Sequence, residues 1–288
     1  MEEVFVSHLT TLVSSMEILE KFLQTTAEHQ FLAFDVEGVC LSRTGEATLI
    51  AIGVHDRERV RVFLFDLLDE TTEYFMKQMS ILKFCLEDAS IIKIVHDCRQ
   101  DSDSLNEFFN IRVAGVFDTS IYNMLITGSA ARDNLNHTLA NYGCEINRGR
   151  NKPQNFYLEN PTYWGNRPLS ADQIACASAD VSSLFELREK LLHYLPPGSL
   201  EVMQKASENA LDEYRSLRYL EDVVVPKEKM GRVIGVGGSG IEKIRSSTGA
   251  IVSTCGGGFR IMAKDKCSIE NAKKMITTKL CVQKYVRK

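Results

Sequence analysis

Phe31-Leu-Ala-Phe-Asp-Val-Glu-Gly-Val39 contains two acids, Asp35 and Glu37, in an otherwise uncharged and mostly apolar run. Residues two positions apart on a β-strand point to the same face, so we expect both carboxylates to point to one spot. The apolar run is typical of a central strand buried on both faces. Because two buried like charges are costly without a positive charge between them, the run favours a divalent metal site. The alternative is an edge strand with two solvated acids.

Length and composition limit the class of protein. A chain of 288 residues suggests about two domains. No apolar stretch approaches the roughly 20 residues of a membrane span, and the N-terminus has no signal-peptide pattern. The eight cysteines are scattered with no Cys-x-x-Cys pair, which argues against a zinc ribbon or a thioredoxin-type site. We therefore expect reduced thiols, no membrane contact, and a cytoplasmic or nuclear protein.

Charge is distributed unevenly along the chain. Residues 221–288 hold 14 Lys+Arg and 6 Asp+Glu, a balance of +8, whereas residues 1–220 hold 20 and 32, a balance of −12. A short basic segment after a larger acidic one suggests that the basic segment binds an anion such as nucleic acid. The alternative is a solvated basic tail.

Hydrophobic patterning predicts an α/β domain with a mixed sheet. The predicted elements, in chain order, are strands at 31–36, 47–54 and 60–66, a helix at 72–86, a strand at 91–95, a helix at 99–109 and a strand at 116–118. Turn-prone segments separate the first three strands, at 42–45 and 55–57. The chain from there to residue 219 is expected to be mostly helical.

A helix is expected from the capping box Ser170-Ala-Asp-Gln173 to about residue 194, where Pro196-Pro-Gly198 stops it. An amphipathic helix at about 199–220 then either packs on the first domain or connects the two. The predicted domains are residues 1–198 and 221–288, with 199–220 as the connecting helix.

Two further acids fall where this architecture can use them. Asp101 begins the helix that follows the strand at 91–95, near the carboxyl end of the sheet, where ligands gather in open α/β folds. Asp180 lies within a helix among small and apolar neighbours, which indicates a packed face. Each also has a local alternative, since acids are favoured at helix N-termini and can pair locally.

The order and context of these acids resemble the DEDD superfamily of 3′–5′ exonucleases, specifically its ribonuclease D-like branch with a ribonuclease H-like fold. The resemblance covers about residues 15–195. It rests on Phe34-Asp-Val-Glu-Gly38, Lys93-Ile-Val-His-Asp-Cys-Arg-Gln-Asp101, Val116-Phe-Asp-Thr119, Trp164-Gly-Asn-Arg-Pro-Leu169 and Asp180. We favour a structural role for Trp164 and Arg167, because such residues before a helix often lock a loop.

The resemblance implies a metal-dependent enzyme that releases nucleoside 5′-monophosphates. Asp35, Glu37, Asp101 and Asp180 would be the catalytic acids and would bind two divalent ions, Mg²⁺ or Mn²⁺. Such ions lie about 3.5–4 Å apart, one activating the attacking water and the other stabilising the leaving oxygen.

One position departs from this pattern. The branch usually has tyrosine four residues before the last aspartate, where its hydroxyl orients the attacking water, and this chain has Cys176. The subgroup with histidine five residues before has Ala175 instead. A thiol is a weak hydrogen-bonding group, and positioning help of this kind is typically worth about 10²–10⁴ in rate. Activity is therefore in doubt; Tyr157 and Tyr163 are candidates to reach the site.

Residues 222–280 resemble a type I KH domain, a small α+β fold. The run includes Gly231-Arg-Val-Ile-Gly235 and a Gly-x-x-Gly loop, Gly235-Val-Gly-Gly238, before a helix. Strands are expected at 251–254 and 259–263, and a last helix at 266–280. The resemblance implies that the loop clamps the backbone of about four single-stranded nucleotides. The implied RNA-binding residues are Arg232, Gly235, Val236, Gly237, Gly238, Lys243 and Arg245, with Val236 at a loop position that is often basic.

The combined prediction is a 3′–5′ exonuclease that hydrolyses single-stranded nucleic acid, most simply RNA, with the KH domain holding the substrate. Single-stranded DNA is an alternative substrate. The alternative function is a weak or inactive exonuclease fold that serves as an RNA-binding or protein-interaction module. The sequence identifies no protein partner.

Overall fold

A computed structural model describes residues 8–27, 29–56, 59–68, 73–129, 131–153, 156–255 and 257–281. It divides into two compact units, Met1–Leu211 and Asp212–Lys288. The predicted turn residue 57, the predicted helix start at 72 and the N-terminal segment 1–7 lie outside the described residues. The predicted domain limits remain predictions.

A six-stranded mixed sheet forms the centre of the first unit, in the order β1-β4-β3-β2-β5-β6. The strands are β1 (His8–Val13), β2 (Phe31–Val39), β3 (Glu46–His55), β4 (Val60–Asp66), β5 (Ile92–Val95) and β6 (Val116–Asp118). β2, β3 and β4 pair antiparallel, whereas β5 and β6 extend the sheet in parallel from β2 and β1 pairs in parallel with β4. The predicted α/β class and mixed sheet are confirmed.

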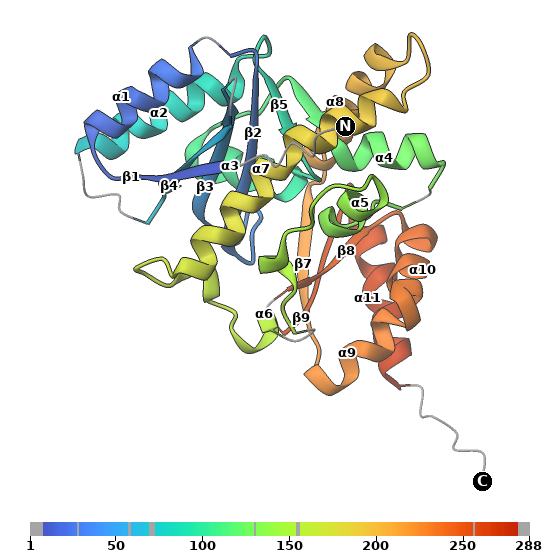
Figure 1. The fold of residues 1–288 in the computed structure, drawn as a ribbon. Helices are drawn as coiled ribbons and strands as arrows, with labels where there is room; N and C mark the ends of the chain where they lie inside the picture. Colours follow the sequence, from blue (N-terminus) through green and yellow to red (C-terminus); the bar gives the residue numbers. More distant parts are fainter. Residues whose placement is uncertain are drawn as a thin grey trace. The chain divides into compact units, whose positions relative to one another are not determined.

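Helices cover both faces of this sheet (Figure 1). They are α1 (Met16–Thr26), α2 (Glu73–Glu87), α3 (Arg99–Phe109), α4 (Thr119–Thr127), α5 (Leu135–Asn141), α6 (Phe156–Glu159), α7 (Ala171–His193) and α8 (Leu200–Arg215). Two 3₁₀ turns, η1 (Arg148–Arg150) and η2 (Tyr163–Gly165), precede α7. The predicted capping box is present at the start of α7, with Ser170 and Gln173 bonded reciprocally.

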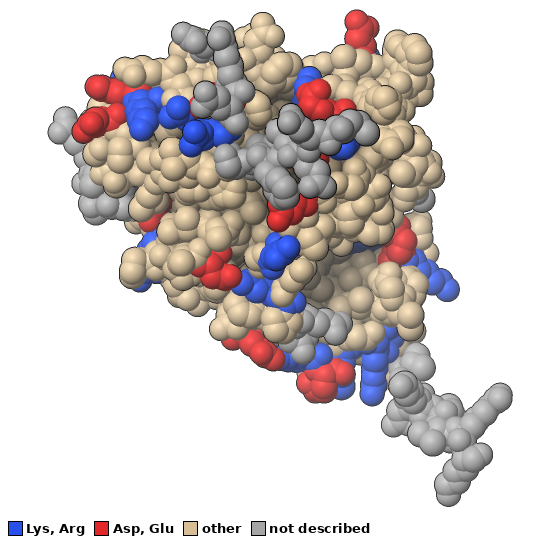
Figure 2. Space-filling model, in the orientation of Figure 1, with Lys and Arg blue, Asp and Glu red and all other residues tan. Residues whose placement is uncertain are grey.

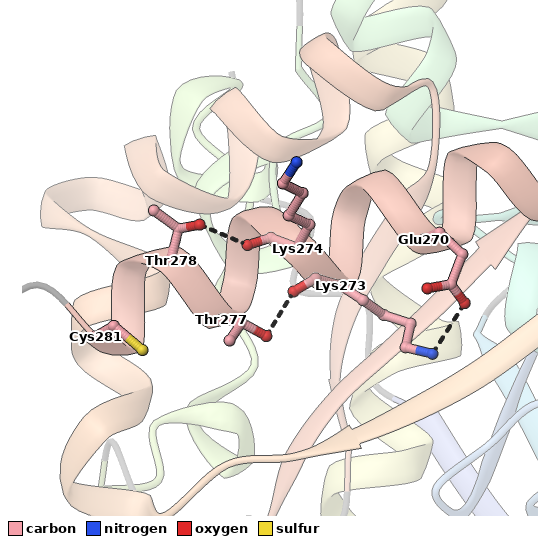
Figure 3. A pocket seen from close by; sticks show the side chains of 6 residues that line it. All are labelled: Glu270, Lys273, Lys274, Thr277, Thr278 and Cys281. Carbon is pink, nitrogen blue, oxygen red and sulfur yellow. Dashed lines mark hydrogen bonds and ion pairs between the residues drawn. The ribbon is translucent and has the colours of Figure 1, made fainter.

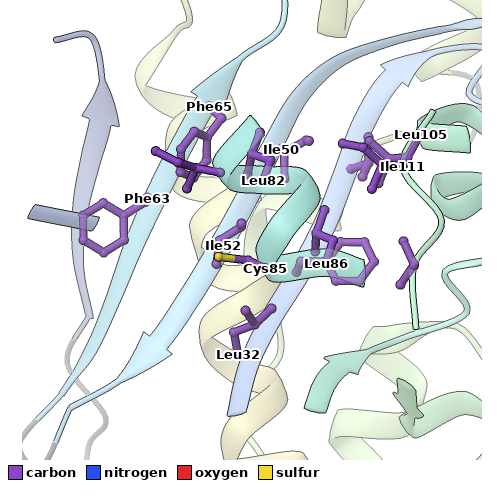
Figure 4. Packing of buried hydrophobic residues seen from close by; sticks show 14 of the residues in the cluster. Leu32, Ile50, Ile52, Phe63, Phe65, Leu82, Cys85, Leu86, Leu105 and Ile111 are labelled. Carbon is purple, nitrogen blue, oxygen red and sulfur yellow. The ribbon is translucent and has the colours of Figure 1, made fainter. Parts of the chain in front are cut away.

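Two apolar clusters hold the sheet between its helices. One packs α1 and α2 on the sheet, with Phe22 edge-on to Phe63 and Phe65 and with Leu82 beside them (Figure 4). The other lies beneath α7, α4 and α5. Burying such apolar surface contributes about 25 cal/mol per Å², so these clusters set which face of each strand each helix covers.

The alternation of β2 decides where its acids point. Phe34 and Val36 belong to the cluster under α1 and α2, and Ala33 belongs to the cluster under α7. Asp35 alternates with Phe34 and Val36 and therefore faces α7. α7 crosses the sheet and contacts β1 through β5, which brings Asp180 over the acids of β2.

Two features of the first unit differ from the sequence prediction. β1 and α1 were not predicted; β1 is an edge strand whose sequence, His-Leu-Thr-Thr-Leu-Val, has little apolar alternation. The helix predicted at 199–220 ends at Arg215, and its residue Leu211 packs in the first unit's core. The chain then enters a strand at Tyr219, because Tyr219–Val224 pairs with a neighbouring strand.

The second unit is a three-stranded antiparallel sheet with three helices. Its strands β7 (Tyr219–Val224), β8 (Ile251–Cys255) and β9 (Gly258–Ala263) take the order β7-β9-β8. The helices are α9 (Lys227–Ile234), α10 (Ser239–Thr248) and α11 (Lys266–Cys281), with the turn η3 (Val236–Gly238) between α9 and α10. This strand–helix–helix–strand–strand–helix order is the one expected for a type I KH fold.

Arg167 ties the loop before α7 to the sheet. Its Nε and Nη2 donate to the two carboxylate oxygens of Asp66, at 2.6 and 2.9 Å. Nη2 also donates to the carbonyl of Thr48 at 2.7 Å, and Nη1 to that of Trp164 at 3.0 Å. These contacts favour the structural role expected for Arg167.

Replacing Arg167 should therefore destabilise the first unit without touching its acids. We expect Arg167→Ala to lower the free energy of unfolding by about 2 kcal/mol, because four charge-assisted hydrogen bonds are lost. Arg167→Lys should recover less than half, since an ammonium cannot bind a carboxylate through two parallel bonds. Urea denaturation measures both, with Lys77→Ala on the exposed face of α2 as control; equal stability of Arg167→Ala and the control would contradict the expectation.

Candidate active site

Three carboxylates converge where α7 crosses β2. Oxygens of Asp35, Glu37 and Asp180 lie within 4.8 Å of one another. A bulge in the β2–β3 pairing falls between Glu37 and Gly38. A Cβ on Gly38 would lie 2.0 Å from the carbonyl oxygen of Glu46, so only glycine fits there. The bulge thus bends the strand directly beside the acids.

Asp101 lies near this cluster but is not one of the three acids whose oxygens lie within 4.8 Å of one another. Its Oδ1 accepts the backbone N–H of Val36 at 2.9 Å. Burial raises the pKa of the Asp101 carboxyl, and the nearby charge of Asp35 raises it further. The structure therefore brings all four predicted acids into one region, with three in mutual reach and Asp101 beside them.

Sequence reasoning missed two residues that contact the acids, Asn147 and Arg150. The buried Asn147 amide donates to Oδ1 of Asp180 at 2.7 Å and to the carbonyl of Cys176 at 2.8 Å. The Nε of Arg150 donates to the same Oδ1 of Asp180, and its Nη2 lies 3.5 Å from Oδ2 of Asp35. The only sequence signal was the run Asn147-Arg-Gly-Arg150, which places two arginines close together within the acidic residues 1–220.

Cys176 lies one helical turn before Asp180, as predicted, and its thiol is buried. Its Sγ is 4.0 Å from Oδ2 of Asp180. Burial, with Asp180 and Glu37 adding to it, raises the pKa of the thiol to about 12, so it is a neutral and weak hydrogen-bonding group at physiological pH.

The two tyrosines differ in reach. The Tyr163 hydroxyl donates a hydrogen bond to Asp172, so it is engaged outside the acid cluster. Burial raises the pKa of the Tyr157 hydroxyl to about 12, and the nearby charge of Glu37 adds to this. Tyr157 is therefore the tyrosine that lies near the acids.

Burial dominates the electrostatics of the cluster. It raises the pKa of Asp35 to about 7, with Arg150 opposing and Asp180 reinforcing the shift. Burial also holds the pKa of Glu37 well above its ordinary value, helped by Asp35 and Asp180. The acids thus bind protons readily unless another cation compensates them.

In the second unit, the glycine-rich loop and the predicted basic residues have different environments. Gly235, Gly237 and Gly238 adopt positive φ, and Val236 is 94% exposed. Arg232 and Lys243 are also exposed. Arg245 is exposed too, but its Nε and Nη2 donate to the carbonyl of Val252, at 3.1 and 2.7 Å, so its guanidinium also supports the fold.

Two surface features of the molecule identify no ligand. A hollow along α11 is lined by side chains of that helix alone (Figure 3). Thr277 and Thr278 bond within the helix, and Lys273 pairs with Glu270 of α11 and Glu221 of β7. On the face drawn in Figure 2, acidic and basic side chains are interspersed among uncharged ones.

Comparison with known families matches both units. Residues 10–196 match the family described as 3′–5′ exonuclease. The chain belongs to this exonuclease family. Residues 220–278 match the KH domain. Both predicted resemblances are confirmed.

Individual relatives are distant. The human piRNA biogenesis protein EXD1 is 26% identical over 171 residues, which cover 56% of this chain and 32% of that protein. The ribonuclease D of Gluconacetobacter diazotrophicus is 31% identical over 112 residues, or 38% of this chain and 26% of that protein. The chain thus spans about a third or less of the length of these relatives.

Among solved structures, the ribonuclease D of Trypanosoma brucei has a TM-score of 0.59 at 22% identity, covering 71% of this chain and 72% of that one. At this identity the likeness establishes the fold of the exonuclease domain. Of the described helices, none is long and apolar enough to cross a membrane.

The raised pKa of Asp35 predicts how its replacement affects stability. In metal-free buffer the folded state keeps its proton up to about pH 7, whereas the unfolded state loses it near 3.8. Stability therefore falls as pH rises through this window. We expect Asp35→Asn to melt at a higher temperature than the native protein at pH 8, with a smaller difference at pH 5.

Calorimetry with EDTA present measures this, with Glu20→Gln on the exposed surface of α1 as the control. A difference between Asp35→Asn and the native protein that is equal at both pH values would contradict the expectation.

Proposed function

We propose that this chain is a metal-dependent 3′–5′ exonuclease that hydrolyses phosphodiester bonds of single-stranded RNA to nucleoside 5′-monophosphates. The observation that carries the proposal is the convergence of Asp35, Glu37 and Asp180 within 4.8 Å in a domain of the exonuclease family. Three acids held together, one buried and two half-buried, destabilise a fold, so packing alone does not account for them.

The donor set fits a divalent ion, since carboxylate oxygens are the ligands that Mg²⁺ and Mn²⁺ prefer. We assign Asp35, Glu37 and Asp180 as ligands and Asp101 as the fourth catalytic acid, on the predicted scheme of two ions. When bound, such ions supply an activated water and stabilise the leaving oxygen. The chain itself orients two of the acids: Asn147 holds Asp180, and the Val36 N–H holds Asp101. Brucella melitensis NrnC, a fold relative at TM-score 0.52, was solved with bound Mg²⁺, which supports the assignment.

We propose RNA as the substrate because the exonuclease fold is joined to a KH domain. The loop Gly235-Val-Gly-Gly238, with exposed Arg232 and Lys243, would hold the strand, since glycine lets backbone N–H groups approach phosphates. The T. brucei ribonuclease D was solved with GMP and with the RNA U12, which supports RNA and a nucleoside monophosphate as ligands. Single-stranded DNA remains the second substrate to test.

The proposal also covers the domain limits of the chain and its cellular location. The exonuclease domain is proposed at 1–198, the connecting segment at 199–220 and the KH domain at 221–288. A cytoplasmic or nuclear location is proposed because Cys85, Cys98, Cys144 and Cys176 keep buried free thiols, which suits a reducing compartment.

A second candidate function is an RNA-binding or protein-interaction module with a weak or inactive nuclease fold. Cys176 at the usual tyrosine position favours it. So does the contact of Arg150 with Asp35 and Asp180, since these are two of the proposed metal ligands.

The two functions differ in a cleavage assay. We expect purified protein with Mg²⁺ or Mn²⁺ to shorten 5′-labelled single-stranded RNA one nucleotide at a time from its 3′ end. Asp35→Ala should reduce the rate at least about 10²-fold, because it removes a ligand of the reacting metal. Denaturing gels resolve the ladder, and labelled DNA serves as the alternative substrate. No shortening in either metal, with Asp35→Ala behaving like the native protein, would leave the binding-module function.

RNA binding by the Gly-x-x-Gly loop is tested at Gly237, which has φ +58° and open space around its Cβ position. Asp and Asn both tolerate this conformation, so Gly237→Asp and Gly237→Asn form a pair that differs mainly in charge. We expect Gly237→Asp to bind single-stranded RNA at least about tenfold more weakly than Gly237→Asn, since its carboxylate repels phosphate. Fluorescence anisotropy with Asp35→Ala in the background, to prevent cleavage, measures both. Equal affinities would argue against phosphate contact at this loop.

A further inference from the structure

The carboxylate cluster contacts a cation that belongs to the chain itself. The guanidinium of Arg150 bridges two of the acids: Nε donates to Oδ1 of Asp180, and Nη2 lies 3.5 Å from Oδ2 of Asp35. The charge of Glu37 also acts on it. Arg150 thus contacts two members of the three-acid cluster and neutralises part of its charge. The Arg150 side chain is 38% exposed, so it can leave without unfolding the core.

The turn that carries Arg150 is firmly seated on both sides. Asn147, at its start, exchanges hydrogen bonds with Asn136 of α5, both at 2.9 Å. The side chain of Asn147 donates to the Cys176 carbonyl and to Asp180 on α7, and its oxygen accepts the N–H of Gly149 at 2.9 Å. These bonds fix the backbone from which Arg150 reaches the acids.

Glycine at position 149 lets this turn pack closely on α7. A Cβ built on Gly149 would lie 2.9 Å from the Cβ and 3.1 Å from the Cα of Cys176. Contacts under 3.0 Å between such atoms require the backbone to shift. A side chain at position 149 therefore displaces the turn that carries Arg150.

We propose that Arg150 is the resident counter-ion of the carboxylate cluster and competes with a divalent ion for Asp35 and Asp180. The inference rests on the proposed function for the existence of the metal site. A guanidinium and a divalent ion that contact the same two carboxylates repel one another. Oδ1 of Asp180 already accepts hydrogen bonds from Asn147 and Arg150. Arg150 thereby sets the metal affinity of this domain, and Gly149 acts as a positioning residue for it.

Metal binding without turnover tests this. Mn²⁺ is titrated into the full chain by isothermal calorimetry, with no RNA present. Arg150→Gln should bind Mn²⁺ at least about tenfold more tightly than the native protein, because a competing charge is gone. Arg148→Gln removes the same charge from an exposed position of the same turn and should change affinity less than about twofold.

A second variant keeps the charge and moves the turn. Gly149→Ala should also tighten Mn²⁺ binding, and adding it to Arg150→Gln should give no further gain. If Arg150→Gln fails to fold, as judged by circular dichroism, Gly149→Ala alone carries the test.

Each outcome separates this inference from the proposed function. Native-like or weaker Mn²⁺ affinity in Arg150→Gln and Gly149→Ala overturns the inference. An equal gain of Mn²⁺ affinity in Arg148→Gln also overturns it. In either case, RNA cleavage by the native protein would still support the exonuclease function. Tighter Mn²⁺ binding in Arg150→Gln with no cleavage by any variant supports the inference and removes the exonuclease function. Absence of Mn²⁺ binding in every variant overturns the inference.

Discussion

Mutual repulsion among three carboxylates in a small buried space is the constraint on which the candidate site depends. The alternation of β2 creates it, because Phe34 and Val36 must enter one apolar cluster and Asp35 therefore faces α7. α7 adds Asp180 from the other side. Burial raises the pKa of Asp35 and Glu37, and the neighbouring carboxylates raise both further, so holding these charges here is costly. The chain offsets that cost in three ways: by protonation, by the guanidinium of Arg150 and by hydrogen bonds to Asp180.

Much of the site follows from short-range sequence patterns. The position of Asp35 and Glu37 depends only on the two-residue repeat of a strand, and that of Asp180 on a packed helix face, so both were predictable. Arg150 was not, because its contact with Asp35 joins residues 115 positions apart through a three-residue turn with no periodicity of its own. Asp101 accepts a backbone hydrogen bond from Val36, a contact that no sequence pattern records.

The same distinction holds for the fold. Strands with long apolar runs, such as β3 and β4, were predicted within one residue of their ends. β1 was missed because an edge strand needs few apolar residues, and its existence depends on pairing with β4 far along the chain. The KH fold was predictable since its motif is local, yet the engagement of Arg245 with the Val252 carbonyl depends on how α10 meets β8. Arg232 and Lys243 are thus the better candidates for phosphate contact.

The packing of Gly149 against Cys176 has a consequence for how such domains diverge. A Cβ at position 149 would meet the Cα and Cβ of residue 176, 27 positions away, and every residue except glycine has both atoms. Position 149 therefore cannot enlarge without moving the backbone of the turn, whatever side chain position 176 carries. A glycine at position 149, more than the identity of the four acids, should therefore mark the members of the family that keep this turn and the cation on it.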